Sequence, residues 1–212
     1  MSQCENEYHE KNGANKVREM IIKRKSRKNQ KKIMVRLENP GDIRGTGLLS
    51  LEKSGKKDQW IYLPSSKKTR RINSRNQGGS FMGSELSYED MGGMIGVEFK
   101  NRTIRNEKIK GRNYAVIESV PFKGQSSYKK IESWVALGKD VITQAKYYDK
   151  KGRLLKVAKF LKYKKHGKLF RAHKLQVKNV QNGRATVMLL RGLKINKDID
   201  DDEFTVAALE DE

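Results

Sequence analysis

Short segments with strand propensity, some of which alternate apolar and polar residues, run through most of the chain between tight turns and limit its fold. Residues 33–37 show the pattern, because Ile33, Val35 and Leu37 fall on one face of an extended strand. The Asn-Gly pair at 182–183 is a strong hairpin signal, since both residue types tolerate positive φ. Strands at spacings of about 10 residues predict an antiparallel meander. The segments are 17–23, 33–37, 48–51, 60–63, 114–120, 128–135, 145–148, 154–163, 169–177 and 185–190.

The first third of the chain is basic and polar. Residues 1–16 are polar, and we expect a poorly ordered segment that precedes one domain spanning residues 17–212. The first two alternating segments predict a β-hairpin around the basic run 23–32. A solvated hairpin tip and a binding role both remain open for this run. Residues 97–109 fit either strand or loop.

Residues 58–93 depart from the regular pattern and predict a lid. An aromatic strand at 60–63 is stopped by Pro64, because proline cannot donate to a β ladder. A glycine-rich loop and a short helix follow, with Ser84 placed to cap the helix and Gly92 to end it. Between strand and loop lies a basic cluster that is expected to face an anionic surface: Lys67, Lys68, Arg70 and Arg71.

The charge balance indicates an anionic partner. The formal net charge is +22, with 34% charged and 35% hydrophobic residues, so the chain is drawn to polyanions. Charge alone favours nucleic acid first and an anionic membrane surface second. No apolar run reaches the roughly 20 residues that span a bilayer, and no signal peptide is visible. The acidic residues 198–203 fit intramolecular docking or, as the favoured interpretation, a solvated surface. Residues 204–209 fit strand or helix.

The sequence carries few signatures of catalysis. Its three histidines show no metal-ligand spacing, and a Walker loop, a dinucleotide fingerprint and a nucleophile elbow are all missing. Glu85, Glu89 and Asp90 could act as paired carboxylates, but charges on a helix surface explain them more simply. We therefore predict a protein that is not an enzyme and uses no metal or cofactor. Residues 159–165 mix basic and aromatic side chains, a weak signal for nucleic-acid binding.

An antiparallel sheet with so little chemistry is suited to enclosing a ligand. If the sheet curves, its apolar face forms a concave surface that a lid can cover, and methionine adapts such a pocket to varied shapes. An ordinary closed core explains the same pattern equally well. The residues predicted to line a lipid cavity are Val35, Leu37, Leu49, Leu51, Trp60, Tyr62, Phe81, Met82, Leu86, Trp134 and Tyr147.

A series of motifs in fixed order resembles a known family. The motifs are PGDIRGTGLL at 40–49, DQWIYLP at 58–64, RRI at 70–72, SFMGS at 80–84, SYED at 87–90 and YYD at 147–149. Together they resemble the outer-membrane lipoprotein-sorting, LolA-like branch of the LolA/LolB-like superfamily. The resemblance extends over residues 17–209.

This resemblance implies a mainly-β fold, a strongly curved antiparallel half-barrel covered by short helices. It implies a periplasmic carrier that shields a lipoprotein acyl anchor or another lipid and has no catalytic residues. Some relatives are associated with lipid exporters, which makes an inner-membrane exporter an expected partner. The family also implies a signal peptide, a first helix and a first strand before residue 17, so we expect a truncated N-terminus.

Two alternatives stand beside the carrier. A basic nucleic-acid-binding module predicts binding that weakens steeply with salt, because phosphate contacts release counterions. A lipid-sensing interaction domain of the envelope predicts recognition of lipid without transfer. Lipid that co-purifies with the protein, and an apolar dye that acyl chains displace, are expected of the carrier.

Overall fold

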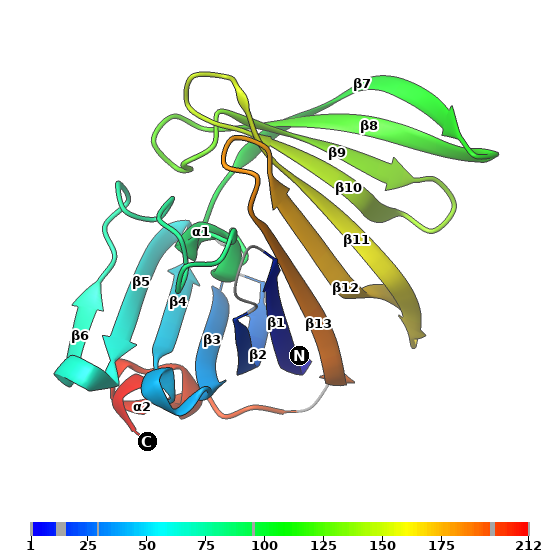
Figure 1. Cartoon of the computed structure of the whole chain (residues 1–212). Coiled ribbons are helices and arrows are strands. Elements are labelled where there is room, and N and C mark those ends of the chain that lie inside the picture. Colours follow the sequence, from blue (N-terminus) through cyan, green and yellow to red (C-terminus); the bar gives the residue numbers. More distant parts are fainter. Residues whose placement is uncertain (1, 12–15, 29, 95, 196–197, 212) are drawn as a thin grey trace.

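The computed structural model describes residues 2–11, 16–28, 30–94, 96–195 and 198–211. These residues form a thirteen-stranded antiparallel sheet that curves strongly and stays open (Figure 1), which confirms the predicted fold class. The strands are β1 (Ser2–Lys11), β2 (Val17–Arg27), β3 (Gln30–Asn39), β4 (Gly47–Lys53), β5 (Lys56–Leu63), β6 (Lys68–Arg71), β7 (Phe99–Ile109), β8 (Arg112–Pro121), β9 (Lys130–Ala136), β10 (Val141–Tyr148), β11 (Leu154–His166), β12 (Leu169–Asn179) and β13 (Ala185–Ile195). The helices are η1 (Gly41–Ile43), η2 (Pro64–Ser66), α1 (Tyr88–Met91), η3 (Asp202–Phe204) and α2 (Val206–Glu210).

The strand order shows two sequential meanders joined in the middle of the sheet. The order is β6-β5-β4-β3-β2-β1-β13-β12-β11-β10-β9-β8-β7. Strand β1 is the joint, because it pairs with β2 on one side and with β13 on the other, where Ser2 lies opposite Ile195. The sequence predicted a poorly ordered polar segment here. Strand pairing rests on backbone hydrogen bonds, so apolar patterning could not reveal it.

The remaining strands follow the sequence pattern closely. Each predicted strand segment corresponds to one strand, and the undecided residues 97–109 supply β7. The basic cluster at 68–71, which was not predicted as a strand, forms β6. The predicted hairpin around the basic run is confirmed as β2–β3. Most of that run lies within the two strands, and Lys25 is only 5% exposed. Its ammonium group donates to the Ile199 carbonyl oxygen at 2.7 Å, so part of the run serves a contact inside the molecule.

The connection between the two meanders crosses the inner face of the curved sheet. Strands β6 and β7 are the two edges of the sheet, and residues 72–98, here called the crossover segment, link them. Helix α1 of this segment lies between the two arms of the sheet in Figure 1. The predicted cap was wrong by one turn. Ser87 caps the helix in a capping box: its hydroxyl accepts from the Asp90 amide, and the Asp90 carboxyl group accepts from the Ser87 amide. Ser84 instead donates its hydroxyl to the Phe81 carbonyl oxygen.

Each face of the sheet has its own hydrophobic core, because neighbouring residues of a strand point to opposite sides. The inner-face core combines Val35 of the first meander, Val177 of the second and Phe81 of the crossover segment. The outer-face core packs Leu49 against Leu209 of the C-terminal segment. The crossover segment therefore fills the inner face of the first meander, and the C-terminal segment covers its outer face.

The C-terminal segment, residues 198–211, is held to the outer face by ion pairs. Asp201 lies 3.1 Å from Lys25, 3.3 Å from Arg27 and 2.9 Å from Lys32. Hydrogen bonds from Lys32 and Lys25 lower the pKa of Asp201 to about 2. The favoured interpretation of this acidic cluster as solvated surface was wrong for Asp201 and Glu203, because buried apolar residues of the segment bring these two acids onto basic strands. Asp198, Asp200 and Asp202 are exposed, as that interpretation predicted. The undecided tail forms helix α2.

The helices of the structure are short. Helix α1 has four residues and α2 has five. Across the described ranges, none of the helices has the length and apolar content needed to cross a membrane. The sheet thus forms the framework of the molecule, and the short helices pack against its faces.

Candidate functional site

An apolar cavity lies between the crossover segment and the inner face of the second meander. Its volume is about 270 Å³, close to the lower end of the range for ligand pockets. Because successive side chains of a strand point to opposite faces, every second residue can face the cavity. Strand β11 contributes Ala158 and Phe160, and β12 contributes Leu175 and Val177. The other lining residues are Arg24, Leu86, Asp90, Met91, Gly93, Met94, Tyr147, Lys156 and Met188.

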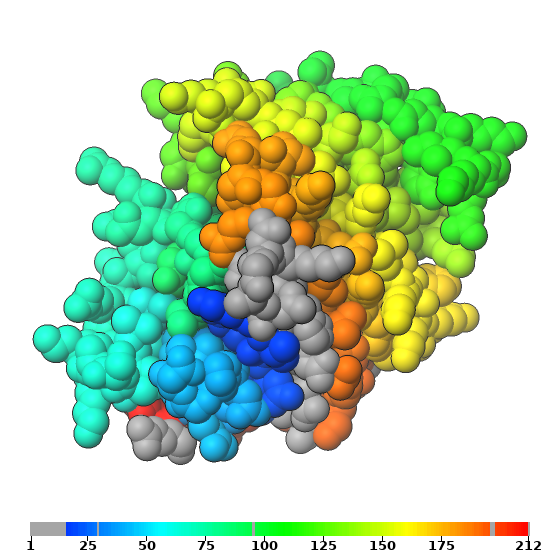
Figure 2. Space-filling model, viewed as in Figure 1, coloured from blue at the N-terminus to red at the C-terminus, as the bar shows by residue number. Residues whose placement is uncertain are grey.

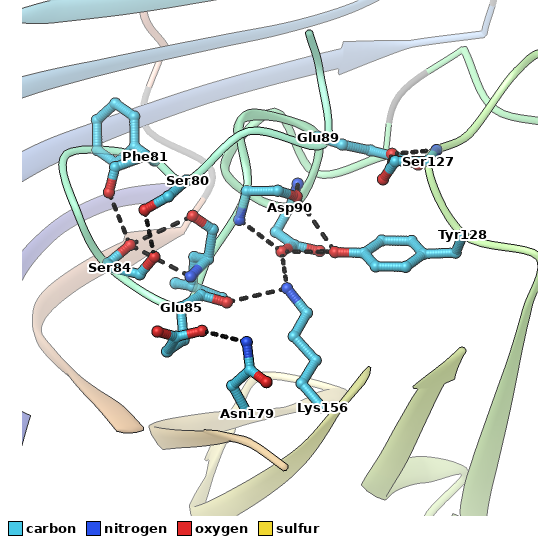
Figure 3. Close-up of polar contacts among 12 residues, drawn as sticks. Ser80, Phe81, Ser84, Glu85, Glu89, Asp90, Ser127, Tyr128, Lys156 and Asn179 are labelled. Carbon is cyan, nitrogen blue, oxygen red and sulfur yellow. Dashed lines mark hydrogen bonds and ion pairs between the residues drawn. The ribbon is translucent and has the colours of Figure 1, made fainter. Parts of the chain in front are cut away.

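Two charged side chains beside the cavity neutralise each other. Lys156 is 4% exposed, and its ammonium group pairs with the Asp90 carboxyl group and donates to the Glu85 carbonyl oxygen at 2.9 Å (Figure 3). The Tyr128 hydroxyl donates to both carboxyl oxygens of Asp90 at 3.0 Å. Burial, followed by the nearby Asp90, raises the pKa of Tyr128 well above its usual value, which keeps this donor protonated. The cavity wall is therefore mainly apolar, and the charges of Asp90 and Lys156 are paired with each other, while Arg24 of β2 adds an exposed cation to the lining.

Burial also keeps the aromatic wall of the cavity neutral. Tyr147 of β10 lies in the wall, and burial, then Asp90, raises the pKa of its hydroxyl. The Lys156 ammonium group lies 5.2 Å from the ring centre of Tyr128 and 5.3 Å from that of Tyr147. These cation–π contacts hold the ammonium group against the two rings.

Buried carboxyl groups fasten the crossover segment to the second meander. Glu89 is fully buried and accepts hydrogen bonds from the Ser127 amide at 2.8 Å, the Ser127 hydroxyl at 2.6 Å and the Ser126 hydroxyl. Glu85 accepts from the Asn179 amide group at 2.7 Å (Figure 3). The interpretation of these acids as surface charges of a helix was wrong, because each faces donors from the sheet or from the loop before β9.

The first meander holds the same segment from its other side. The Gln59 amide of β5 donates to the Tyr88 carbonyl oxygen at 2.8 Å and to the Ser50 hydroxyl at 2.9 Å. A Cβ atom at Gly92 would lie 2.8 Å from both Gln59 Nε2 and Ser50 Oγ, so this close approach requires glycine. The crossover segment is thus bonded to both arms of the sheet.

The structure separates the predicted cavity residues into several environments. Leu86 and Tyr147 line the cavity. Val35, Leu37 and Phe81 lie in the filled inner core of the first meander, and Met82 packs against that core. The remaining five residues lie on the outer face: Leu49, Leu51, Trp60, Tyr62 and Trp134.

Strand alternation explains why these outer residues do not join the cavity. Trp60 and Ile61 are neighbours, and Ile61 belongs to the inner core, so Trp60 must face outward. In the second meander, Trp134 donates its indole N–H to Glu107 at 2.9 Å, and Lys146 lies over its ring. The cavity residues that were not predicted lie partly on β11, β12 and β13, where alternation was present as a signal. The others, Arg24 of β2 and Asp90, Met91, Gly93 and Met94 of the crossover segment, carry no such signal.

The basic cluster predicted to face an anionic surface lies at an edge of the sheet. Lys67 follows η2 with a positive φ of 49°, and Lys68, Arg70 and Arg71 belong to edge strand β6. All four side chains are exposed, and Arg71 pairs with Asp58 of β5. Their role as an anionic-surface site stays a prediction. Within the described residues, no group of three or more His, Cys, Asp or Glu side chains could hold a metal ion.

These features together define a class of protein: an open β half-barrel whose inner face holds an apolar cavity beneath a fastened crossover segment. A family model described as "uncharacterized protein" matches residues 29–211. A search of curated proteins finds no match.

Solved structures give the family. A domain from Vibrio parahaemolyticus described as an outer membrane lipoprotein-sorting protein is 30% identical with a TM-score of 0.90, over 99% of this chain and 91% of that one. A DUF1329 family protein from Desulfovibrio piger is 25% identical with a TM-score of 0.88, over 98% and 90% of the chains. A LolA superfamily protein from Nitrosomonas europaea shares the fold at 20% identity and a TM-score of 0.80, over 98% and 90%. The chain belongs to the family of the outer membrane lipoprotein-sorting protein domain from Vibrio parahaemolyticus, and it shares the fold of the LolA superfamily protein.

Proposed function

We propose that this protein carries a lipid, either the acyl anchor of a lipoprotein or another acyl chain, through the cell envelope. The observation that carries the proposal is the apolar cavity on the inner face, whose neighbouring charges, Asp90 and Lys156, are paired with each other. A mainly apolar cavity whose two buried charges are paired with each other suits a hydrocarbon chain better than a polar substrate, and the exposed Arg24 in its lining suits an anionic end of such a lipid. The similarity to a domain described as lipoprotein-sorting supports the same proposal.

Burial of hydrocarbon supplies the affinity in this proposal. Each methylene group removed from water contributes about 0.8 kcal/mol, so a few methylenes give useful binding without any specific polar contact. Met91, Met94 and Met188 contribute flexible side chains to the wall, which lets one cavity accept chains of different shape. Part of a longer chain would extend along the inner face, because the cavity has only about 270 Å³.

Release of the lipid then depends on the crossover segment. Its bonds to Ser127, Asn179 and Gln59 fix it over the inner face. A receptor that competes for the chain, or a contact that shifts this segment, would open the cavity. We place the carrier in the periplasm and propose an inner-membrane exporter as a donor of cargo. In this proposal the protein performs no catalysis.

The test is displacement of an apolar fluorescent dye by fatty acids, combined with mass spectrometry of lipid extracted from the gently purified protein. Phe160→Asp places a charge in the cavity wall and should weaken dye binding by tenfold or more. Val180→Asp, at a position 45% exposed, is the matched control and should bind dye as the wild type does.

A second variant guards against simple misfolding. Ala158→Leu extends an apolar side chain from β11 toward the cavity and should reduce dye binding while the protein keeps its circular dichroism spectrum. Equal dye binding by all three variants and the wild type, or purified protein that neither contains lipid nor binds dye, would remove the carrier proposal.

A further inference from the structure

The second meander ends in three hairpins at one side of the molecule. In an antiparallel meander every second turn lies at the same end, which places the β7–β8, β9–β10 and β11–β12 turns together. Figure 1 shows the three tips along one side of the sheet, and the β7–β8 hairpin projects in the space-filling view (Figure 2). We call this side the hairpin rim, formed by residues 108–112, 137–142 and 164–171.

Each tip of the hairpin rim exposes a large aliphatic side chain. Ile109 is 41% exposed on the first hairpin, Leu137 is 52% exposed on the second and Leu169 is 47% exposed on the third. Ile142, also on the second hairpin, is 41% exposed. Single exposed aliphatic residues are common on protein surfaces, but one at every tip of a row of hairpins forms a pattern.

The same rim is strongly basic. Its three segments hold eight lysine or arginine residues and one acidic residue, Asp140. All eight cationic residues are exposed. They are Lys108, Lys110, Arg112, Lys139, Lys164, Lys165, Lys168 and Arg171. Apolar tips surrounded by cations match a surface that is anionic outside and apolar just beneath, which is the chemistry of an anionic lipid bilayer.

Printed contacts between the hairpins make the rim one continuous surface. The Leu137 amide donates to the Asn113 carbonyl oxygen at 3.0 Å, which ties the second hairpin to the first. The Lys139 ammonium group lies 5.4 Å from the ring centre of Phe170, and this cation–π contact ties the second hairpin to the third. The tips are therefore held in a fixed arrangement and can meet a flat surface together.

The rim is also the end of the face that holds the cavity. Along β12, Leu169 has the same parity as Leu175 and Val177, which line the cavity, so all three share the inner face. Leu137 continues the inner-face positions of β9 that begin at Ile131. A chain that leaves the cavity along this face reaches the rim.

We propose that the hairpin rim docks the protein on an anionic lipid bilayer, with Ile109, Leu137 and Leu169 entering the headgroup region. This inference deepens the carrier function, on which its physiological meaning rests, and names the surface by which the carrier meets a membrane. Nucleic acid is the less suitable partner, because aliphatic tips gain nothing from phosphates and the aromatic residues of the rim, His166 and Phe170, are half-buried instead of exposed as platforms for bases. The surface is distinct from the predicted cluster at Lys67.

The experiment is co-sedimentation with vesicles of phosphatidylcholine, with and without a third of phosphatidylglycerol. The wild type should bind only the anionic vesicles. The triple variant Ile109→Ser, Leu137→Ser, Leu169→Ser should bind them at least tenfold more weakly, because it loses apolar contact and keeps every charge. Lys165→Gln with Lys168→Gln should weaken binding about fivefold per lysine at low salt.

A charge-matched control separates the two basic surfaces. Lys67→Gln with Lys68→Gln removes the same charge from the β6 edge and should leave vesicle binding within twofold of wild type. The reverse result, with loss from this control and none from the triple serine variant, would overturn the proposal. So would binding of DNA that is tighter than binding of vesicles and insensitive to the serine substitutions.

The same variants keep this proposal apart from the carrier proposal. The rim substitutions lie outside the cavity wall, so they should leave displacement of the dye by fatty acids unchanged. Vesicle binding that depends on the tips in a protein that takes up no dye would refute only the carrier. Dye uptake by a protein that ignores anionic vesicles would refute only the docking surface.

Discussion

Glu89 tests the view that the crossover segment is fastened by buried polar contacts. Its carboxyl group is fully buried and accepts three hydrogen bonds from Ser126 and Ser127. Glu89→Ala removes the acceptor and leaves three donors facing a void. Each unsatisfied buried donor costs about 1–3 kcal/mol, and the relieved desolvation of the carboxyl group offsets part of that total. We therefore expect a loss of about 2–4 kcal/mol in the free energy of unfolding.

The assay is thermal unfolding followed by circular dichroism. For a chain of this size, 1 kcal/mol shifts the melting temperature by about 2–4 °C, so Glu89→Ala should melt about 4–16 °C below the wild type. Glu89→Gln keeps the shape of the side chain and one acceptor oxygen, so its melting temperature should lie between those of the wild type and Glu89→Ala. Glu98→Ala is the control, because that side chain is exposed and nine residues further along the same segment.

The position of the effect matters as much as its size. Amide exchange should accelerate first across residues 77–94, which the Glu89 contacts hold in place. Dye binding by the cavity should weaken as well, because the segment forms one of its walls. If Glu89→Ala and Glu98→Ala melted at the same temperature, the carboxyl group would not be a fastener and the reasoning would fail.

Two further predictions concern the C-terminal segment. Leu209→Ala empties a fully buried position in the outer core and should cost about 2–5 kcal/mol in urea unfolding, whereas Val206→Ala, 37% exposed, should cost under about 1. Equal costs would mean that the segment does not pack as described. Because the folded pKa of Asp201 is depressed to about 2, its ion pairs stabilise the protein above about pH 4, and this stability is lost as the pH falls toward 2. The melting difference between wild type and Asp201→Asn should shrink over that window, while Asp198→Asn shows none; a constant difference would refute the ion-pair account.

The strands could be predicted because their physics is local. A residue alternation with period two needs only neighbouring residues, and Pro64 or the Asn-Gly pair at 182–183 marks the end of a strand without reference to the rest of the chain. The same locality explains the failure at β1. One of its two partners, β13, lies at the other end of the sequence, and the polar strand itself carries no apolar alternation that would reveal it.

The candidate site was harder to predict because it depends on which face each residue takes and on distant partners. Trp60 was predicted to line the cavity, but its neighbour Ile61 occupies the inner face, so Trp60 points to the outer face. The burial of Glu89 depends on Ser127, from a loop beyond two strands of the second meander, and a sequence does not show such pairing. The order of the motifs identified the family. One of them, the SYED motif at 87–90, supplies both the helix cap and the carboxyl group that fastens the crossover segment.

The position of β1 has a consequence for how the molecule is made. Each meander pairs strands that are close in sequence, and such contacts form quickly. The joint instead brings Ser2 beside Ile195, so its closure spans nearly the whole chain and must wait until the last strand exists. Until then, β1 and β13 each present an unpaired edge that another copy could extend. The seam that closes last therefore runs through the middle of the sheet, and it is where a folding chain is most exposed to aggregation.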